Sequence, residues 1–128
     1  MVKITSGKMI SSLVFAIVLI FVLTISVNAA SHTVYIDKGD GPVQSGQITA
    51  NNGANYNGYN SSQSGHKLYI TLQSSSGSGW NDQKVSLMDI GQSASGYSSL
   101  SGDLLWRVQL NPQYYFTDCI GWGTVSNR

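Results

Sequence analysis

Apolar and polar residues alternate along much of the chain beyond residue 30, and this period of two is the pattern of half-buried β-strands. The clearest segment is His66–Gln73, where Leu68, Ile70 and Leu72 point to one side and their neighbours to the other. Asp103–Leu110 alternates in the same way. Glutamate is absent, serine, glycine and asparagine are plentiful, and apolar residues do not recur at helical spacing. The pattern predicts an all-β protein.

Tyr114–Val125 alternates as a third strand, with an interruption at Asp118. Weaker alternation predicts three further strands, which are Thr33–Ile36, Val43–Thr49 and Lys84–Ile90. Three polar stretches are predicted to be loops, namely Ala50–Gly65, Ser74–Asp82 and Gly91–Gly102. Short strands with frequent turn signals are typical of a two-sheet β-sandwich or a small barrel. We therefore expect about six to seven antiparallel strands, with Leu, Ile, Val and Trp on the inward faces.

The N-terminal segment has the three parts of a secretory signal peptide. Lys3 and Lys8 precede an unbroken apolar run, Leu13–Leu23, and small residues surround Ala29. A membrane-spanning helix needs about 20 apolar residues, so cleavage after Ala29 is the prediction and an uncleaved anchor is the alternative. Residues 30–128 would then form one secreted β domain without a membrane span.

Charge narrows the range of partners. Two of the seven basic residues lie in the predicted signal peptide, so five basic residues face six aspartates in residues 30–128. A nucleic-acid-binding domain usually carries a clustered basic face, and these cations are scattered. We expect no nucleic-acid partner.

Cys119 is the single cysteine, although the predicted compartment is oxidising. An intramolecular disulfide is therefore impossible, and Cys119 is expected either to be buried or to join two molecules. A pairing of Cys119 with His66 would make a thiolate nucleophile, but no local motif supports it.

Other catalytic and metal-binding patterns are weak. A Gly-x-Ser-x-Gly elbow is missing, and Asp118 alone has apolar neighbours, whereas glycoside hydrolysis needs two carboxylates. Asp37–Gly41 resembles part of a calcium loop but lacks the distal glutamate, so an acidic turn is favoured. We predict no catalytic residue, no metal site and no cofactor.

Three aromatic residues in polar segments indicate a binding function. Tyr56, Tyr59 and Trp80 lie in segments predicted to be polar loops, where core packing does not explain them. Tyrosine and tryptophan next to asparagine, serine and glycine form the composition of binding loops. The alternative is a flexible loop whose tyrosines fold back on the sandwich edge. Trp106 and Trp122 lie in register with core residues and are expected to be structural.

A layout of three motifs resembles small secreted β-sandwich bacteriocins of the lactococcin type. The motifs are a Tyr/Asn/Gly/His stretch from Tyr56 to His66, a Gly-x-x-x-Trp from Gly102 to Trp106, and Tyr114–Phe116. The resemblance implies antibacterial activity; the additional N-terminal strands and Cys119 depart from that layout.

Our prediction from sequence is a secreted, non-enzymatic binding module. It would recognise a cell-surface glycan, another cell-envelope component or a protein through Tyr56, Tyr59 and Trp80. A bacteriocin-like antibacterial protein is the first alternative, and a small extracellular hydrolase is the second.

Overall fold

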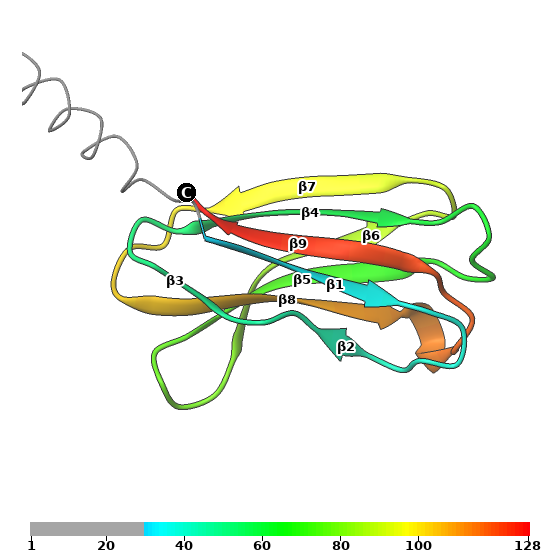
Figure 1. Cartoon of the computed structure of the whole chain (residues 1–128), viewed down its shortest axis with the longest axis horizontal. Coiled ribbons are helices and arrows are strands. Elements are labelled where there is room, and N and C mark those ends of the chain that lie inside the picture. The colour runs from blue at the N-terminus through cyan, green and yellow to red at the C-terminus, as the bar shows by residue number, and fades with distance from the viewer. Residues whose placement is uncertain (1–29) are drawn as a thin grey trace, which may run out of the picture.

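The computed structural model describes residues 30–128, and the predicted signal peptide, residues 1–29, lies outside this range. Nine antiparallel strands form two layers (Figure 1). Their bounds are β1 Ser31–Ile36, β2 Val43–Gln44, β3 Ile48–Ala50, β4 Ala54–Asn60, β5 Leu68–Ser75, β6 Asn81–Met88, β7 Ser93–Ser98, β8 Leu104–Pro112 and β9 Gly121–Asn127. The predicted all-β sandwich is confirmed, with more strands than expected.

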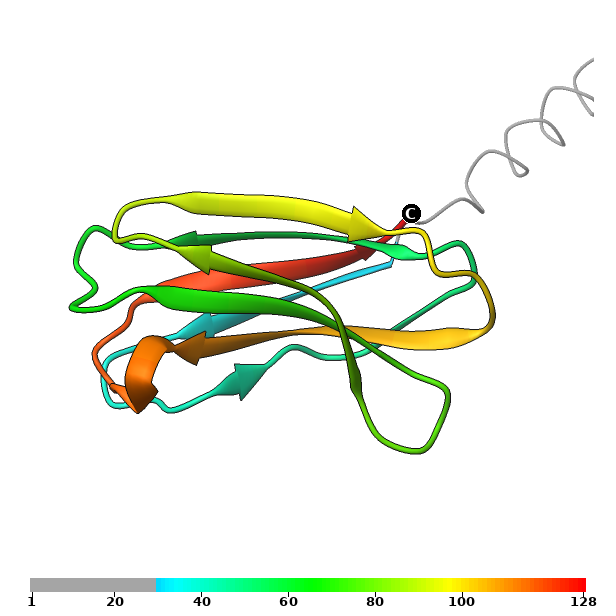
Figure 2. The same ribbon diagram turned by 180° about the vertical axis from the view of Figure 1, so that it is seen from behind.

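Within each sheet, neighbouring strands are often distant in the sequence. Sheet A has the order β1-β9-β4-β7, and sheet B has the order β2-β8-β5-β6, with β3 also paired to β8. The last strand, β9, therefore lies between β1 and β4 in the middle of sheet A. Figure 2 shows the opposite side, where the edge strands β6 and β7 run next to each other.

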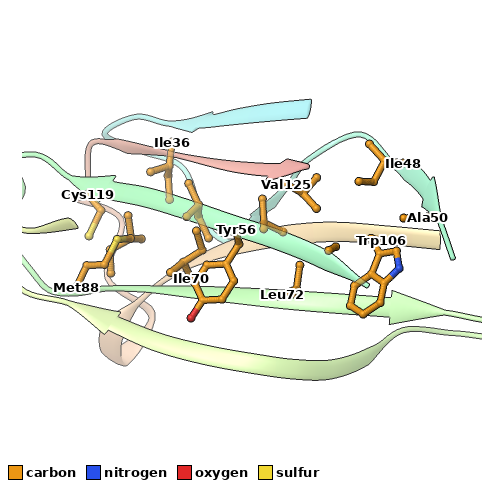
Figure 3. Packing of buried hydrophobic residues seen from close by; sticks show 14 residues of the cluster. Ile36, Ile48, Ala50, Tyr56, Ile70, Leu72, Met88, Trp106, Cys119 and Val125 are labelled. Carbon is orange, nitrogen blue, oxygen red and sulfur yellow. The ribbon is translucent and has the colours of Figure 1, made fainter. Parts of the chain in front are cut away.

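Aliphatic and sulfur-containing side chains, the ring of Tyr56 and the indole of Trp106 fill the core between the sheets (Figure 3). Leu68, Ile70 and Leu72 of β5 are fully buried, as their alternation predicts. Trp106 and Val108 of β8 are also fully buried. Trp106 is therefore a core residue, in agreement with its register in the sequence.

Two paired glycines allow the sheets to approach closely. Gly58 of β4 lies opposite Gly123 of β9, and the side chain of Ile70 packs against both. A Cβ atom at Gly58 would lie 2.7 Å from Ile70 Cδ1, and one at Gly123 would lie 3.1 Å from the same atom. These are positions where close backbone approach requires glycine.

Three predictions about individual segments are wrong. The predicted loop Ala50–Gly65 contains β4, and the predicted loop Gly91–Gly102 contains β7. The predicted strand Tyr114–Val125 is strand only from Gly121, because its first part is a short 3₁₀ turn and an exposed loop. Glycine, asparagine and serine have low intrinsic strand preference, so pairing with β9 and with each other is what makes β4 and β7 strands.

Pairing also changes the boundaries of other elements. The predicted strand Val43–Thr49 is divided into β2 and β3, which pair with different parts of β8. The predicted loop Ser74–Asp82 is shorter than expected, because β5 continues to Ser75 and β6 begins at Asn81.

Candidate functional site

The three aromatic residues predicted to bind a ligand lie in three different environments. Tyr56 points into the sandwich, is 6% exposed, and its hydroxyl lies 2.7 Å from the Ser86 hydroxyl of β6 (Figure 3). Tyr59 lies on the opposite side of the same strand, on the outer face of sheet A. Trp80 lies just before β6, on the other sheet. The structure therefore does not bring the three together.

Tyr59 belongs to a group that the sequence prediction missed. In the register of sheet A, Trp122 of β9 lies opposite both Tyr35 of β1 and Tyr59 of β4. Neighbouring strands are about 4.8 Å apart, so the three residues lie side by side on the outer face of three strands. We call Tyr35, Trp122 and Tyr59 the aromatic row. Tyr35 is 72% exposed, and the other two are half-buried.

Uncharged polar side chains adjoin the aromatic row on the side away from the β1–β2 and β8–β9 connections. Each strand of sheet A contributes three outward positions, and none of these twelve residues is charged. Thr33 and Thr124 share a hydrogen bond of 2.7 Å between their hydroxyl groups. Asn57 and Ser95 continue the same cross-strand row towards the edge strand β7.

A shallow hollow adjoins Trp122 on this face. Its volume is about 330 Å³, and it is lined by Asn57, Gly58, Ser93, Ala94, Ser95 and Trp122. The aromatic row therefore borders a depression in which amide and hydroxyl groups converge. Trp122, expected to be structural, is instead half-exposed beside this hollow.

Trp80 forms part of a polar network on the outer side of sheet B. The Arg107 guanidinium lies 4.2 Å from the centroid of the Trp80 ring. Arg107 Nε donates to Gln73 Oε1 at 2.8 Å, and Gln73 Nε2 donates to Asp82 Oδ1 at 2.8 Å. Burial lowers the pKa of Arg107 from its ordinary value. This stacked and hydrogen-bonded arrangement explains Trp80 as a structural partner of Arg107.

The thiol and the imidazole considered as a nucleophilic pair do not face each other. His66 Nδ1 lies 2.8 and 2.7 Å from the two carboxylate oxygens of Asp118, and its ring stacks on Phe116. Cys119 is fully buried, and its Sγ donates instead to the backbone carbonyl of His66 at 3.3 Å. Burial raises the pKa of the Cys119 thiol, and the charge of Asp118 adds to this effect. These contacts favour a structural cysteine.

The other chemical candidates have structural partners as well. Asp37 Oδ1 accepts from the amide of Lys38 at 2.8 Å, and Asp40 Oδ2 accepts from the amide of Asp37 at 2.9 Å. The carboxylates of this acidic turn thus cap their own backbone. Within residues 30–128, no three side chains of His, Cys, Asp or Glu are arranged to hold a metal ion.

A second exposed aromatic group lies at the β8–β9 connection. Tyr114 and Tyr115 are 76% and 86% exposed and have φ values of 56° and 61°. Left-handed backbone at two successive tyrosines costs on the order of 1 kcal/mol each and persists only where neighbouring contacts impose it. The amide of Gln113 donates to the Lys67 carbonyl, and the amide of Gly39 donates to the Thr117 carbonyl. We call Tyr114–Phe116 the aromatic tip.

Comparison with known proteins bears on the fold. The chain matches no family model and no curated protein. Among solved structures it resembles PirA, with a TM-score of 0.51 and 14% identity over 74% of this chain and 90% of that one. It also matches the Yersinia pseudotuberculosis-derived mitogen (YPM), with a TM-score of 0.43 and 17% identity over 77% of this chain and 84% of that one.

The first of these matches supports the two-sheet, β-sandwich-like architecture. At such low identity, the likeness is one of fold. The chain is thus a small β-sandwich-like protein, and its function has to be argued from its own surface. No helix within residues 30–128 is long and apolar enough to cross a membrane.

Proposed function

We propose that this protein is a secreted, non-enzymatic module that binds a glycan of the cell surface through the outer face of sheet A. The observation that carries the proposal is the aromatic row of Tyr35, Trp122 and Tyr59 next to a field of uncharged hydroxyl and amide groups. Secretion is inferred from the signal-peptide pattern of residues 1–29.

The chemistry of this face matches that of a sugar chain. A pyranose ring has an apolar C–H face that can cover an aromatic ring, and a rim of hydroxyl groups that donate and accept hydrogen bonds. Asn57, Thr124 and Ser95 lie in the row next to the aromatic row and offer both kinds of group. A face built on hydrogen-bonded strands is also ordered before binding, which lowers the entropic cost of binding.

The composition of the face favours binding over hydrolysis. The twelve outward positions of sheet A contain no aspartate, histidine or cysteine. Hydrolysis of a glycosidic bond normally needs an acid and a second carboxylate on either side of that bond.

The test removes the aromatic row and measures binding. Purified residues 30–128 would be incubated with insoluble polysaccharides and isolated cell walls, in wild-type form and with Tyr35, Trp122 and Tyr59 changed singly to alanine. We expect each change to weaken binding about tenfold, the effect of losing roughly 1.4 kcal/mol of contact. The matched control changes Tyr114 and Tyr115 to alanine, which removes exposed rings elsewhere.

The proposal is wrong if the three single variants bind like wild type while their thermal unfolding is also unchanged. If a variant loses binding and also unfolds at a lower temperature, Tyr35→Ala separates the two effects. Tyr35 is 72% exposed, so its removal should affect the fold least.

The aromatic tip favours an antibacterial protein as the second candidate. Tyr114–Phe116 belongs to the layout that resembles lactococcin-type bacteriocins, and the tip is exposed, where it is able to meet a target cell. Purified residues 30–128 would then inhibit bacterial growth, and Tyr114→Ser together with Tyr115→Ser would reduce the inhibition. Binding without any inhibition at saturating protein would exclude this candidate.

A further inference from the structure

A second concave surface lies along the open edge of the sandwich, between β6 and β7. Its volume is about 500 Å³, and it is lined by Tyr56, Lys84, Gly96, Tyr97, Ser98 and Ser99. We call it the β6–β7 groove. The two strands that border it are the edge strands of sheets B and A on the same side of the molecule (Figure 2).

Tyr56 connects the two sides of this groove. Its ring extends from β4 across the gap, and its hydroxyl meets Ser86 of β6 at 2.7 Å. Gly96 of β7 makes room for the ring, because a Cβ atom there would lie 2.9 Å from both the hydroxyl oxygen and Cε1 of Tyr56. Tyr56, which the sequence predicted to bind ligand, thus has a hydroxyl group at the groove although its ring is buried.

Lys84 places a positive charge in the groove. It pairs with Leu72 of β5, whose side chain is fully buried, so Lys84 points to the inner side of β6 at the open edge. No carboxylate lies within 4.0 Å of its ammonium group in the part of the chain that the structure describes, where the ion pairs are Lys67–Asp89 and His66–Asp118.

Charges elsewhere in the molecule make this edge distinct. Arg128 lies with its guanidinium 4.1 Å from the centroid of the Tyr97 ring, so a second cation borders the same strand. Four of the six aspartates, in contrast, lie in the loops at one end of the sandwich: Asp37, Asp40, Asp89 and Asp118. The groove is lined by hydroxyl groups and one ammonium group, without a carboxylate.

The groove is continuous with the proposed glycan-binding face. Tyr97 lines the groove and also occupies an outward position of β7, opposite Asn55 of β4. A chain lying on sheet A can therefore pass over β7 and enter the groove without leaving the protein surface.

We infer that the β6–β7 groove binds an acidic sugar residue, whose carboxylate pairs with the ammonium group of Lys84 while its hydroxyl groups meet those of Tyr56, Ser98 and Ser99. This inference rests on the proposed glycan-binding function and names the class of ligand: a glycan that contains uronic or other carboxylated sugars. A hydrogen bond to a charged group is stronger than one between neutral groups, so the carboxylate provides specificity for this class.

The experiment compares matched acidic and neutral oligosaccharides. One pair is a hyaluronan tetrasaccharide and the same tetrasaccharide with its carboxylates reduced to alcohols; the other is sialyllactose and lactose. We expect wild-type residues 30–128 to bind the acidic member of at least one pair about tenfold more tightly at low salt, and this preference to shrink as sodium chloride is added. Lys84→Gln should remove most of the preference, and Lys84→Arg should retain most of it.

The matched control is Lys38→Gln, which removes the same charge from an exposed position in the β1–β2 loop. It should leave the preference intact. Equal binding of acidic and neutral members by wild type would overturn the inference, as would an unchanged preference in Lys84→Gln. A charged residue pointing inward on an edge strand also protects that strand against aggregation. If Lys84→Gln aggregates while its soluble fraction keeps the preference for acidic ligands, the role of Lys84 is this protection and the inference is wrong.

The outcomes separate this inference from the proposed function. Loss of the aromatic row should weaken binding of acidic and neutral members alike, whereas loss of Lys84 should weaken only the acidic members. Neutral binding that depends on the aromatic row, without an acidic preference, would leave the function standing and reject the groove. Binding of acidic and neutral members that is insensitive to the aromatic row would reject the function.

Discussion

Trp106 shows how one residue fills the core between the two sheets. It is fully buried on β8, opposite Ser74 of β5 and Ile48 of β3. Among residues 30–128 its indole Nε1 has no hydrogen-bond partner, so the side chain contributes through its volume and apolar area. Tryptophan at this position is therefore explained by packing.

We predict that Trp106→Ala lowers the free energy of unfolding by about 3 to 5 kcal/mol, because it opens a large cavity in the core. Trp106→Phe should cost much less, since it keeps most of the apolar area and loses an N–H group that has no partner. Urea denaturation followed by circular dichroism measures both. A loss under 1 kcal/mol for Trp106→Ala would contradict the core placement.

Cys119 provides a prediction about pH. Burial raises the pKa of its thiol in the folded state, so the unfolded chain loses that proton at a lower pH than the folded chain. Between these two values the folded state holds more protons, and the free energy of unfolding falls as the pH rises. The contribution of the neutral thiol is complete below the ordinary thiol pKa of about 8.5 and declines above it.

The measurement compares wild type with Cys119→Ala from pH 7 to pH 10. The free energy of unfolding of wild type, relative to that of Cys119→Ala, should fall as the pH rises. Native Cys119 should also react slowly with a thiol reagent and rapidly in urea. Rapid labelling of the native protein, or a covalent dimer on a non-reducing gel, would contradict burial.

Among the strands, β4 shows how a polar sequence is held in a core layer. Its inward positions are Ala54, Tyr56, Gly58 and Asn60, so alternation is present although only two of the four side chains are apolar. Asn60 is fully buried, and its Nδ2 donates to the carbonyls of His66 and Met88, each at 3.1 Å. The asparagine thereby connects the end of β4 to the neighbouring loop and to β6.

We predict that Gly58→Ala destabilises the protein by about 1 to 3 kcal/mol. The added Cβ would lie 2.7 Å from Ile70 Cδ1 and 3.0 Å from the Trp122 carbonyl oxygen, and the latter is backbone that yields poorly. Gly41→Ala is the matched control, because no atom of the described residues lies within 4 Å of a Cβ atom there. The midpoints of thermal unfolding of the two variants test this prediction. Equal midpoints would contradict it, because they would show that the structure accommodates a Cβ atom at Gly58 without loss of stability.

At the scale of the whole molecule, the sandwich assembles its surfaces from remote segments. The aromatic row joins residues 35, 59 and 122, and the β6–β7 groove joins residues 56, 84 and 96–99. Each surface therefore depends on the complete set of strands, since β9 is the last element and lies at the centre of sheet A. Truncation before β9 would remove the partner of both β1 and β4.

We predict that residues 30–128 are the secreted product. N-terminal sequencing of protein from the culture medium should start at Ala30 or within a residue or two, and this product should show the same cooperative unfolding as a recombinant chain of residues 30–128. Recovery of Met1-containing protein only in the membrane fraction would show that the segment is an anchor.

The sequence by itself determined the class of fold and its most regular strands. Leu68, Ile70 and Leu72 alternate strictly with more polar neighbours, and Trp106 lies in register with Val108 and Leu110. Such local periodicity survives folding because each side chain faces the same side whatever the strand order. The single cysteine likewise excludes an intramolecular disulfide.

The tertiary structure decided which polar segments are strands and which aromatic residues share a surface. Ala54–Asn60 and Ser93–Ser98 are strands because remote strands satisfy their backbone groups, a contribution that local propensity does not contain. Tyr59 has Trp122 beside it, and Tyr35 on the far side of Trp122, only through the register of β9 with β4 and β1. Tyr114–Phe116 belongs to a predicted strand but is exposed, because the chain leaves the sheet after Pro112. Long-range pairing is therefore the physical reason that the binding surfaces could not be read from local pattern.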